Sequence, residues 1–268
     1  MADGLCLEQV RDCLDRDCEL FMFEKTDSTN EQALIKVRQG HSLPLACFAD
    51  EQTHGRGRRG KVWVSPPGSS IYMSLAWLFN LPISELGALS LAMGVAVARV
   101  LKGAGIEQVG LKWPNDVLVD EKKIAGILIE TAQLSTKTAT TIIGIGLNFK
   151  LPRDIVEAPD QPWTDVVSLL DEAEGAIGRE RLAGQLLQEC MFVCENFAVE
   201  KHQLLIEYQR FDICAQQPVN VFLENNIMLQ GVALGVETSG EIRILINGEE
   251  RLFNSANISM RKTDHAND

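Results

Sequence analysis

The feature that most constrains the fold is a closely spaced series of short apolar segments in the middle of the chain. Residues 109–111, 117–119, 124–130 and 140–148 are predicted strands, and the middle pair is joined tightly across Asp120-Glu121-Lys122. Such spacing is typical of a meander in an antiparallel or mixed sheet, and it disfavours a repeated βαβ fold.

The preceding and following segments add helices and further strands. We expect strands at 20–24, 45–49 and 71–78, and helices at 5–17, 28–40, 85–104, 165–172 and from 179 to about 208. Ser28-Thr29-Asn30-Glu31 has capping-box spacing, and Gly40 marks the end of that helix. These helices are expected to pack on the sheet, which makes the fold α+β.

After Pro218 the sequence pattern changes to short alternating segments. Strands are expected at 219–223, 227–236, 242–246 and 258–260. Asn225-Asn226, Ser239-Gly240 and Asn247-Gly248 are hairpin turn residues, because they accept positive φ. This pattern predicts a compact barrel of about five strands, similar in size to an SH3 domain. The expected domains are therefore 1–216 and 217–268.

The formal net charge of −12 argues against general adhesion to nucleic acid or an anionic membrane. The N-terminus lacks the layout of a secretory signal, and the apolar runs are shorter than the ~20 residues of a membrane span. We therefore expect a cytoplasmic protein. The seven cysteines have no Cys-x-x-Cys spacing and no closely spaced histidines, so neither a disulfide frame nor a zinc site is suggested.

Residues 52–61 are a local exception to the acidic balance, because Arg56, Arg58, Arg59 and Lys61 alternate with glycines. Glycine brings backbone N–H groups close to a ligand, and guanidinium groups bind phosphate or carboxylate bidentately. The segment is therefore predicted to be a mobile clamp for an anion. By itself it also fits a solvated basic loop or a nucleic-acid patch.

A second polar group follows the strand at 109–111, in Lys112-Trp113-Pro114-Asn115-Asp116. A turn that bonds its own backbone would explain Asn115 and Asp116 alone. Lys123 and Gly126 in the next strand favour a site, because an interior glycine indicates close approach of a ligand or another backbone.

Gly144-Ile145-Gly146-Leu147-Asn148 lacks the third glycine of a dinucleotide fingerprint and lies within a strand. Its alternating glycines are better explained by space for a flat ligand beside the sheet.

In chain order, the informative motifs are Asp27-Ser28-Thr29-Asn30, the basic segment from Gln52 to Gly60, Trp63-Val64-Ser65-Pro66, the segment from Lys112 to Asp116, Lys123-Ile124-Ala125-Gly126-Ile127, and Gly144 to Asn148. Together they closely resemble bacterial biotin–protein ligases over roughly residues 20 to 260. The resemblance implies a class II synthetase-like mixed sheet with helices on one face, followed by an SH3-like barrel. The N-terminal segment lacks the winged helix of the repressor members, so we expect no repressor role. Lys61 stands where many relatives have arginine, which affects only details of loop closure.

The resemblance also implies a reaction. In the family, the biotin carboxylate attacks the α-phosphate of ATP to give biotinyl-adenylate and pyrophosphate. A lysine of the apo carboxyl-carrier domain then takes the biotinyl group. Mg²⁺ is expected with the triphosphate, held mainly by phosphates and water rather than by a protein metal site.

Residue roles are carried over from matching positions. The implied catalytic residues are Lys123, Arg58, Asp116 and Lys112. The implied biotin-binding residues are Ser28, Thr29, Asn30, Gln52, Gly55, Arg56, Gly57, Arg58, Trp63, Lys123 and Gly126, with Gly144 beside Gly126 in the floor of an apolar slot. The implied nucleotide-binding residues are Arg58, Arg59, Trp63, Lys112, Asn115, Asn148 and Trp163. For Trp163, a loop anchor in the core is nearly as good an interpretation as stacking on adenine.

The sequence disfavours two alternative functions. A lipoate–protein ligase relative is disfavoured, because its Arg-Arg-x-x-Gly-Gly-Gly segment is not present. A non-catalytic protein that binds nucleic acid through 56–61 is disfavoured by the acidic balance. The sequence leaves open a monomer or a homodimer, and it does not identify the acceptor carboxylase.

Overall fold

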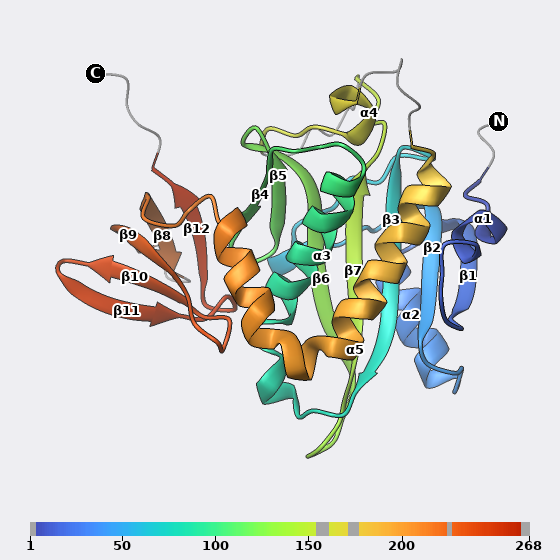
Figure 1. Cartoon of the computed structure of the whole chain (residues 1–268), viewed down its shortest axis with the longest axis horizontal. Coiled ribbons are helices and arrows are strands. Elements are labelled where there is room, and N and C mark those ends of the chain that lie inside the picture. Colours follow the sequence, from blue (N-terminus) through green and yellow to red (C-terminus); the bar gives the residue numbers. More distant parts are fainter. Residues whose placement is uncertain (1–3, 154–160, 171–176, 224–226, 264–268) are drawn as a thin grey trace.

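The computed structural model describes residues 4–153, 161–170, 177–223 and 227–263. Two β-sheets organise the chain (Figure 1). The larger has seven strands in the order β1-β2-β3-β7-β6-β5-β4, and only β1 and β2 pair in parallel. The mixed sheet expected from the central meander is therefore confirmed.

Each strand of this sheet is slightly longer than its apolar run. The strands are β1 (Glu19–Thr26), β2 (Leu45–Gln52), β3 (Ser70–Phe79), β4 (Val109–Lys112), β5 (Asp116–Val119), β6 (Lys122–Leu134) and β7 (Ala139–Asn148). The tight turn between β5 and β6 places Asp120 and Glu121 at positive φ.

The helices are α1 (Leu7–Arg11), α2 (Thr29–Arg38), α3 (Leu89–Gly103), α4 (Val166–Leu169) and α5 (Arg179–Phe211), with 3₁₀ turns at Arg58–Gly60 and Ile83–Leu86. The first helix is shorter than the predicted 5–17, because the backbone N–H of Asp15 instead donates to the Gln188 side chain at 3.1 Å. The predicted helix at 165–172 begins at Val166 and is capped by Asp165, whose carboxylate accepts the Ser168 N–H at 2.8 Å. Its last two residues lie outside the described ranges.

The capping box at Ser28 is a wrong prediction. Ser28 stands at the N-cap position but makes no side-chain cap bond. Asp27 replaces it, because its Oδ1 accepts from the Ser28 N–H at 2.7 Å and from the Gln32 side chain at 3.2 Å. The Ser28 hydroxyl is therefore left for another partner.

The two long helices, α3 and α5, cover one face of the large sheet (Figure 1). Successive side chains of β2 and β3 point to opposite faces of the sheet, so only every second one packs against α3 and α5. Phe48, Met73 and Leu75 belong to the core beneath these helices. Cys47 and Ala76 point to the opposite face and pack with α2. The one-face arrangement thus holds for the long helices, whereas α2 lies on the other face.

The second sheet has five antiparallel strands in the order β11-β10-β9-β8-β12. They are β8 (Pro218–Leu223), β9 (Met228–Val236), β10 (Ile242–Ile246), β11 (Glu249–Phe253) and β12 (Ile258–Lys262). Sequence reasoning missed β11, whose outward positions carry charges. In the described chain the pairings form an open row, so closure into a barrel stays a prediction.

The predicted turn residues Gly240, Asn247 and Gly248 have positive φ, as expected, and the Asn225-Asn226 turn lies outside the described residues. The small sheet contacts the large one where the Trp113 Nε1–H donates to the Gly240 carbonyl at 3.0 Å. We retain 1–216 and 217–268 as proposed domains. Among the described residues, no helix combines the length and apolarity needed to cross a bilayer.

Candidate active site

The candidate site is a row of residues across the face of the large sheet that carries α2. Lys112 stands opposite Asp116, Asp116 opposite Gly126, and Gly126 opposite Gly146. Directly opposite residues of antiparallel strands point to the same face. The α2 face is identified by Gly144, two residues from Gly146 along β7, where an added Cβ would lie 2.2 Å from the Asn30 Oδ1.

The glycines of this row make room for an indole. A Cβ at Gly126 would approach the Trp63 ring at 2.9 Å, and one at Gly146 would approach it at 2.4 Å. The sequence predicted space for a flat ligand beside the sheet, whereas this space is taken by the Trp63 indole itself. The pairing of Gly144 with Gly126 in the slot is corrected, since Gly144 makes room for Asn30 and Gly146 lies under the indole.

We predict that Gly146→Ala lowers the free energy of unfolding by about 1–3 kcal/mol, because the added methyl group overpacks the Trp63 contact. Urea unfolding measures the change. Gly103→Ala is the control, since nothing lies within 4 Å of its added Cβ and alanine favours a helix. Equal destabilisation of both variants would contradict the role assigned to Gly146.

Lys123 and Asp116 form an ion pair at the centre of the row. The Lys123 Nζ lies 2.5 Å from the Asp116 Oδ1, and their side chains are only 16% and 18% exposed. The Lys123 N–H donates to the Pro162 carbonyl at 2.9 Å, and its backbone forms a bridge with Trp163. Its ammonium lies 5.2 Å from the Trp63 ring centroid. Lys123 is therefore fixed at both its backbone and its ammonium.

The two predicted asparagines support this arrangement. The Asn115 Nδ2 donates to the Ile127 carbonyl at 2.9 Å, which fastens the turn before β5 to β6. The Asn148 Nδ2 donates to the Thr164 carbonyl at 3.0 Å and to the Lys123 carbonyl at 3.4 Å. Contacts of Asn115, Asn148 and the Trp163 ring with a nucleotide remain predictions.

The basic segment folds as a small hairpin beside this site. The Trp63 N–H donates to the Gly55 carbonyl at 2.9 Å, and the Gly57 N–H donates to the Lys61 carbonyl at 2.7 Å. At the tip, Arg59 has φ +57° and Gly60 has φ +72°. The hairpin explains the glycine at position 55, where a Cβ would meet the Trp63 carbonyl at 2.4 Å.

The arginines at the tip contact the second sheet. The Arg58 Nη2 donates to the Ser255 carbonyl at 2.5 Å, and the Arg59 Nη2 donates to the Ala256 carbonyl at 2.8 Å. Burial lowers the pKa of Arg58, as does the charge of Arg59, while the Asp116 carboxylate opposes both. The sequence did not predict that the connection between β11 and β12 would hold this loop.

Arg56 lies on the other side of the hairpin and contacts two carboxylates. Its Nη2 is 3.0 Å from the Glu130 Oε2 and 3.5 Å from the Glu31 Oε2. Glu130 was not among the predicted site residues. Its position at the end of an apolar strand was the only signal in the sequence.

A buried polar cluster lies between α2 and the hairpin. The Gln52 Oε1 accepts the Thr29 N–H at 2.9 Å, and the Gln52 Nε2 donates to the Ser65 Oγ at 3.0 Å. Ser28 and Thr29 are both buried. Thr29 Oγ1 also contacts Ser74, a hydroxyl inside a strand that sequence reasoning passed over. The structure therefore brings Thr29 and Gln52 together, with Ser28 buried next to Thr29 in the chain.

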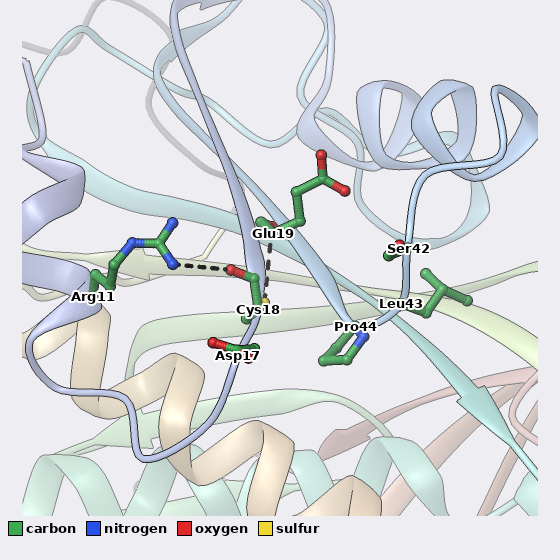
Figure 2. A pocket seen from close by; sticks show the side chains of 7 residues that line it. All are labelled: Arg11, Asp17, Cys18, Glu19, Ser42, Leu43 and Pro44. Carbon is green, nitrogen blue, oxygen red and sulfur yellow. Dashed lines mark hydrogen bonds between the residues drawn. The ribbon is translucent and has the colours of Figure 1, made fainter.

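A separate depression lies at the opposite ends of β1 and β2 (Figure 2). Its lining residues are Arg11, Asp17, Cys18, Glu19, Ser42, Leu43 and Pro44. It includes none of the predicted site residues. The row on the α2 face therefore remains the candidate site.

Comparison with known proteins identifies the family of the chain. Residues 22–148 match the family model described as the biotin/lipoate A/B protein ligase family. The bifunctional ligase/repressor BirA of Escherichia coli is 32% identical over 240 residues, which cover 89% of this chain and 73% of that protein. The biotin–[acetyl-CoA-carboxylase] ligase of Mycobacterium tuberculosis is 30% identical over 245 residues, with 90% and 88% covered.

A solved structure shares the fold. The biotin protein ligase from Aquifex aeolicus, in complex with biotin and ATP, superimposes with a TM-score of 0.71 at 26% identity. The match covers 91% of this chain and 99% of that one. The motifs, the fold and the length of these alignments lead to one conclusion: this chain belongs to the biotin–protein ligase family.

Proposed function

We propose that this chain is an ATP-dependent biotin–protein ligase. It activates biotin as biotinyl-5′-adenylate, releases pyrophosphate, and transfers biotin to a lysine of the apo biotin carboxyl carrier domain of a carboxylase. The observation that carries the proposal is the Lys123–Asp116 ion pair beside the Trp63 indole, on the floor formed by Gly126 and Gly146. This places a fixed cation and a carboxylate beside an apolar slot.

The first step joins two anions, so positioning and fixed positive charge lower its barrier. A biotin carboxylate oxygen forms a bond to the α-phosphorus of ATP, and the bond from that phosphorus to the bridging oxygen breaks to release pyrophosphate. Lys123 would bind the carboxylate and the developing charge, with Lys112 adding positive potential from the opposite side of Asp116. Mg²⁺ would enter with the triphosphate.

The second step transfers the biotinyl group to an amine. The acceptor lysine must first lose a proton, because an ammonium group has no free electron pair for attack. Asp116 is the proposed proton acceptor. The neutral amine then forms a bond to the acyl carbon, the bond from that carbon to the phosphate oxygen breaks to release AMP, and the nitrogen gives its extra proton to water as the amide forms.

The remaining binding roles are proposed from the matching positions of the family. Ser28, Thr29 and Gln52 would hydrogen-bond the ureido ring of biotin, and Trp63 would cover its apolar part. Asn148 and Trp163 lie beside Lys123 and would face the nucleotide. The arginine hairpin, with Arg58 and Arg59 at its tip, would close over the adenylate.

We predict that Arg58→Gly releases biotinyl-adenylate into solution at least about tenfold faster than the unmodified protein. The change removes the side chain that fastens the hairpin tip to Ser255. Biotinylation of an added free amine measures the escape. Lys61→Ala is the matched control, since Lys61 is exposed and its carbonyl pairs with Gly57 beside the tip of the same hairpin. Equal retention by the Arg58 variant and the unmodified protein would contradict the clamp.

The proposed function is tested by biotin-dependent exchange of pyrophosphate into ATP, catalysed by the pure protein. Exchange that requires biotin is expected, and its absence would refute the function. Competition between biotin and lipoate, measured by the thermal shift of the protein, distinguishes a biotin ligase from a lipoate ligase. Salt-dependent binding to arbitrary DNA or RNA would support the nucleic-acid alternative instead.

A further inference from the structure

The basic hairpin, residues 55–63, is tied to the start of α2 through a single carboxylate oxygen. The Glu130 Oε2 accepts a hydrogen bond from the Arg56 Nη2 at 3.0 Å and another from the Asn30 Nδ2 at 2.7 Å. We propose that Glu130 is a positioning residue, which holds the hairpin closed over the cluster of Thr29 and Gln52 and so slows the loss of biotin from the site. The effect on biotin rests on the proposed function, whereas the closure of the hairpin does not.

The Glu130 carboxylate has a rigid base for this role. Glu130 lies on β6 and points to the same face as Gly126 of the floor, because side chains alternate along a strand. Its partner Asn30 is only 5% exposed, and the Asn30 Oδ1 contacts the Ser74 Oγ of β3 at 2.5 Å. The Asn30 Nδ2 also lies 3.5 Å from the Leu128 carbonyl oxygen. The carboxylate is therefore held by an amide that is itself fixed between α2 and two strands.

The hairpin is fixed at its base but exposed farther along. At the base, the Thr53 N–H donates to the Thr26 carbonyl at 2.9 Å. Farther along, Arg56 pairs with Val62 across the hairpin, and Val62 is 71% exposed. Apolar burial therefore contributes little to holding this outer part closed, since stabilisation by burial scales with the apolar area removed from water. The contacts of the charged side chains carry more of the closure.

Charged side chains hold the hairpin from two sides. At the tip, Arg58 and Arg59 donate to neutral backbone carbonyls of the small sheet. On the side of α2, Arg56 meets the Glu130 carboxylate at 3.0 Å, and the Glu31 carboxylate is farther away at 3.5 Å. A hydrogen bond between two charged groups is stronger than one to a neutral acceptor. Loss of Glu130 would therefore release the side of the hairpin next to α2 while the tip stays held.

Digestion with trypsin tests the closure, because the hairpin must open before the protease can cut it. At low protease concentration, the cleavage rate follows the population of the open form. Glu130→Ala should raise cleavage within residues 56–61 of the ligand-free chain about fivefold, the upper end of the range for an exposed ion pair. The fragments are identified by mass. Cleavage at Lys137, exposed in the turn between β6 and β7, is the reference for global unfolding.

Removal of Arg56 separates this role from a general effect of Glu130 on α2. In an Arg56→Ala background, Glu130→Ala should change cleavage at the remaining hairpin sites by less than about twofold, because the partner is already absent. If Glu130 acted only by holding Asn30, its effect would be the same in both backgrounds. Glu51→Ala is the matched control, since the ion pair of Glu51 with Lys25 lies outside the hairpin. It should leave hairpin cleavage within about twofold of the unmodified rate.

The rate of biotin dissociation supplies the second readout. Labelled biotin is bound without ATP and chased with unlabelled biotin. Glu130→Ala should release the label about fivefold faster, while the association rate stays within about twofold, since weakened contacts act mainly on dissociation. A general loss of folded protein would instead lower the amount of bound label without changing the dissociation rate. Glu51→Ala should release the label at the unmodified rate.

Unchanged hairpin cleavage in Glu130→Ala would overturn the inference, as would an equal increase in Glu51→Ala or an equal increase with and without the Arg56 side chain. Faster cleavage with unchanged biotin dissociation would overturn it too, because the closure would then not retain biotin. Failure of the unmodified protein to bind biotin would refute the proposed function. The ligand-free cleavage rates test the closure whether or not biotin binds, so the two failures are distinguishable.

Discussion

Replacing Lys123 by alanine is expected to slow formation of biotinyl-adenylate by about 10²–10³-fold, the effect of removing one fixed group that stabilises developing charge. The Lys123 ammonium is the cation that the structure fixes beside the glycine floor, through its ion pair with Asp116 and its backbone bond to Pro162. Its removal leaves the biotin carboxylate and the α-phosphate to repel one another. Biotin-dependent pyrophosphate exchange measures this step.

Lys122→Ala is the matched control for this prediction. Lys122 is the preceding residue of β6, carries the same charge and is exposed. It should retain exchange within about threefold, since an exposed charge contributes little. Exchange in the Lys123 variant close to that of the control would show that the first step does not depend on this ammonium.

The second large effect is expected for Asp116→Ala, which should slow transfer from bound adenylate to the carrier by about 10²-fold or more. Adenylate formation should fall less, by about tenfold, because Lys123 remains but loses the carboxylate that orients it. Single-turnover transfer from preformed biotinyl-adenylate isolates the second step, and pyrophosphate exchange isolates the first.

Asp116→Asn sharpens this division, since an amide can still accept a hydrogen bond from Lys123 but is too weak a base to take a proton. It should restore adenylate formation more than transfer. Equal losses in both steps, in both variants, would instead assign Asp116 a purely structural role beside Lys123.

The sheet could be predicted from the sequence because its strands are short apolar runs joined by turns of recognisable chemistry. Asn247-Gly248 and Asp120-Glu121 do form positive-φ turns. The prediction that Ser28 caps α2 was wrong. Asp27 and Ser28 are adjacent, and the spacing of residues does not show which of the two side chains bonds to the backbone. The strand β11 was missed because its side chains are mostly polar and exposed.

The members of the site could be predicted from their motifs, but their partners could not. The Lys123–Asp116 pair depends on the register of β5 and β6, which shifts between Val117 and Leu118. The contact of Arg58 with Ser255 joins residues 197 positions apart in the chain. Such contacts are set by tertiary packing, which local patterns do not encode.

The same limit applies to the surroundings of Asn30. Its place in the Asp27-Ser28-Thr29-Asn30 motif implies a biotin contact, which stays a prediction. Its amide contacts Glu130 and Ser74, which come from two different strands. The sheet order places β3 and β6 on either side of β7, and all three strands contact α2.

The central claim is that this chain forms and transfers biotinyl-adenylate, and the most direct measurement is the intact mass of an apo carboxyl-carrier domain incubated with the protein, ATP and biotin. We predict that the carrier gains the mass of one biotinyl group, and that the gain requires both ATP and the carrier lysine. A carrier that remains unmodified, while a known biotin–protein ligase modifies it under the same conditions, would contradict the account.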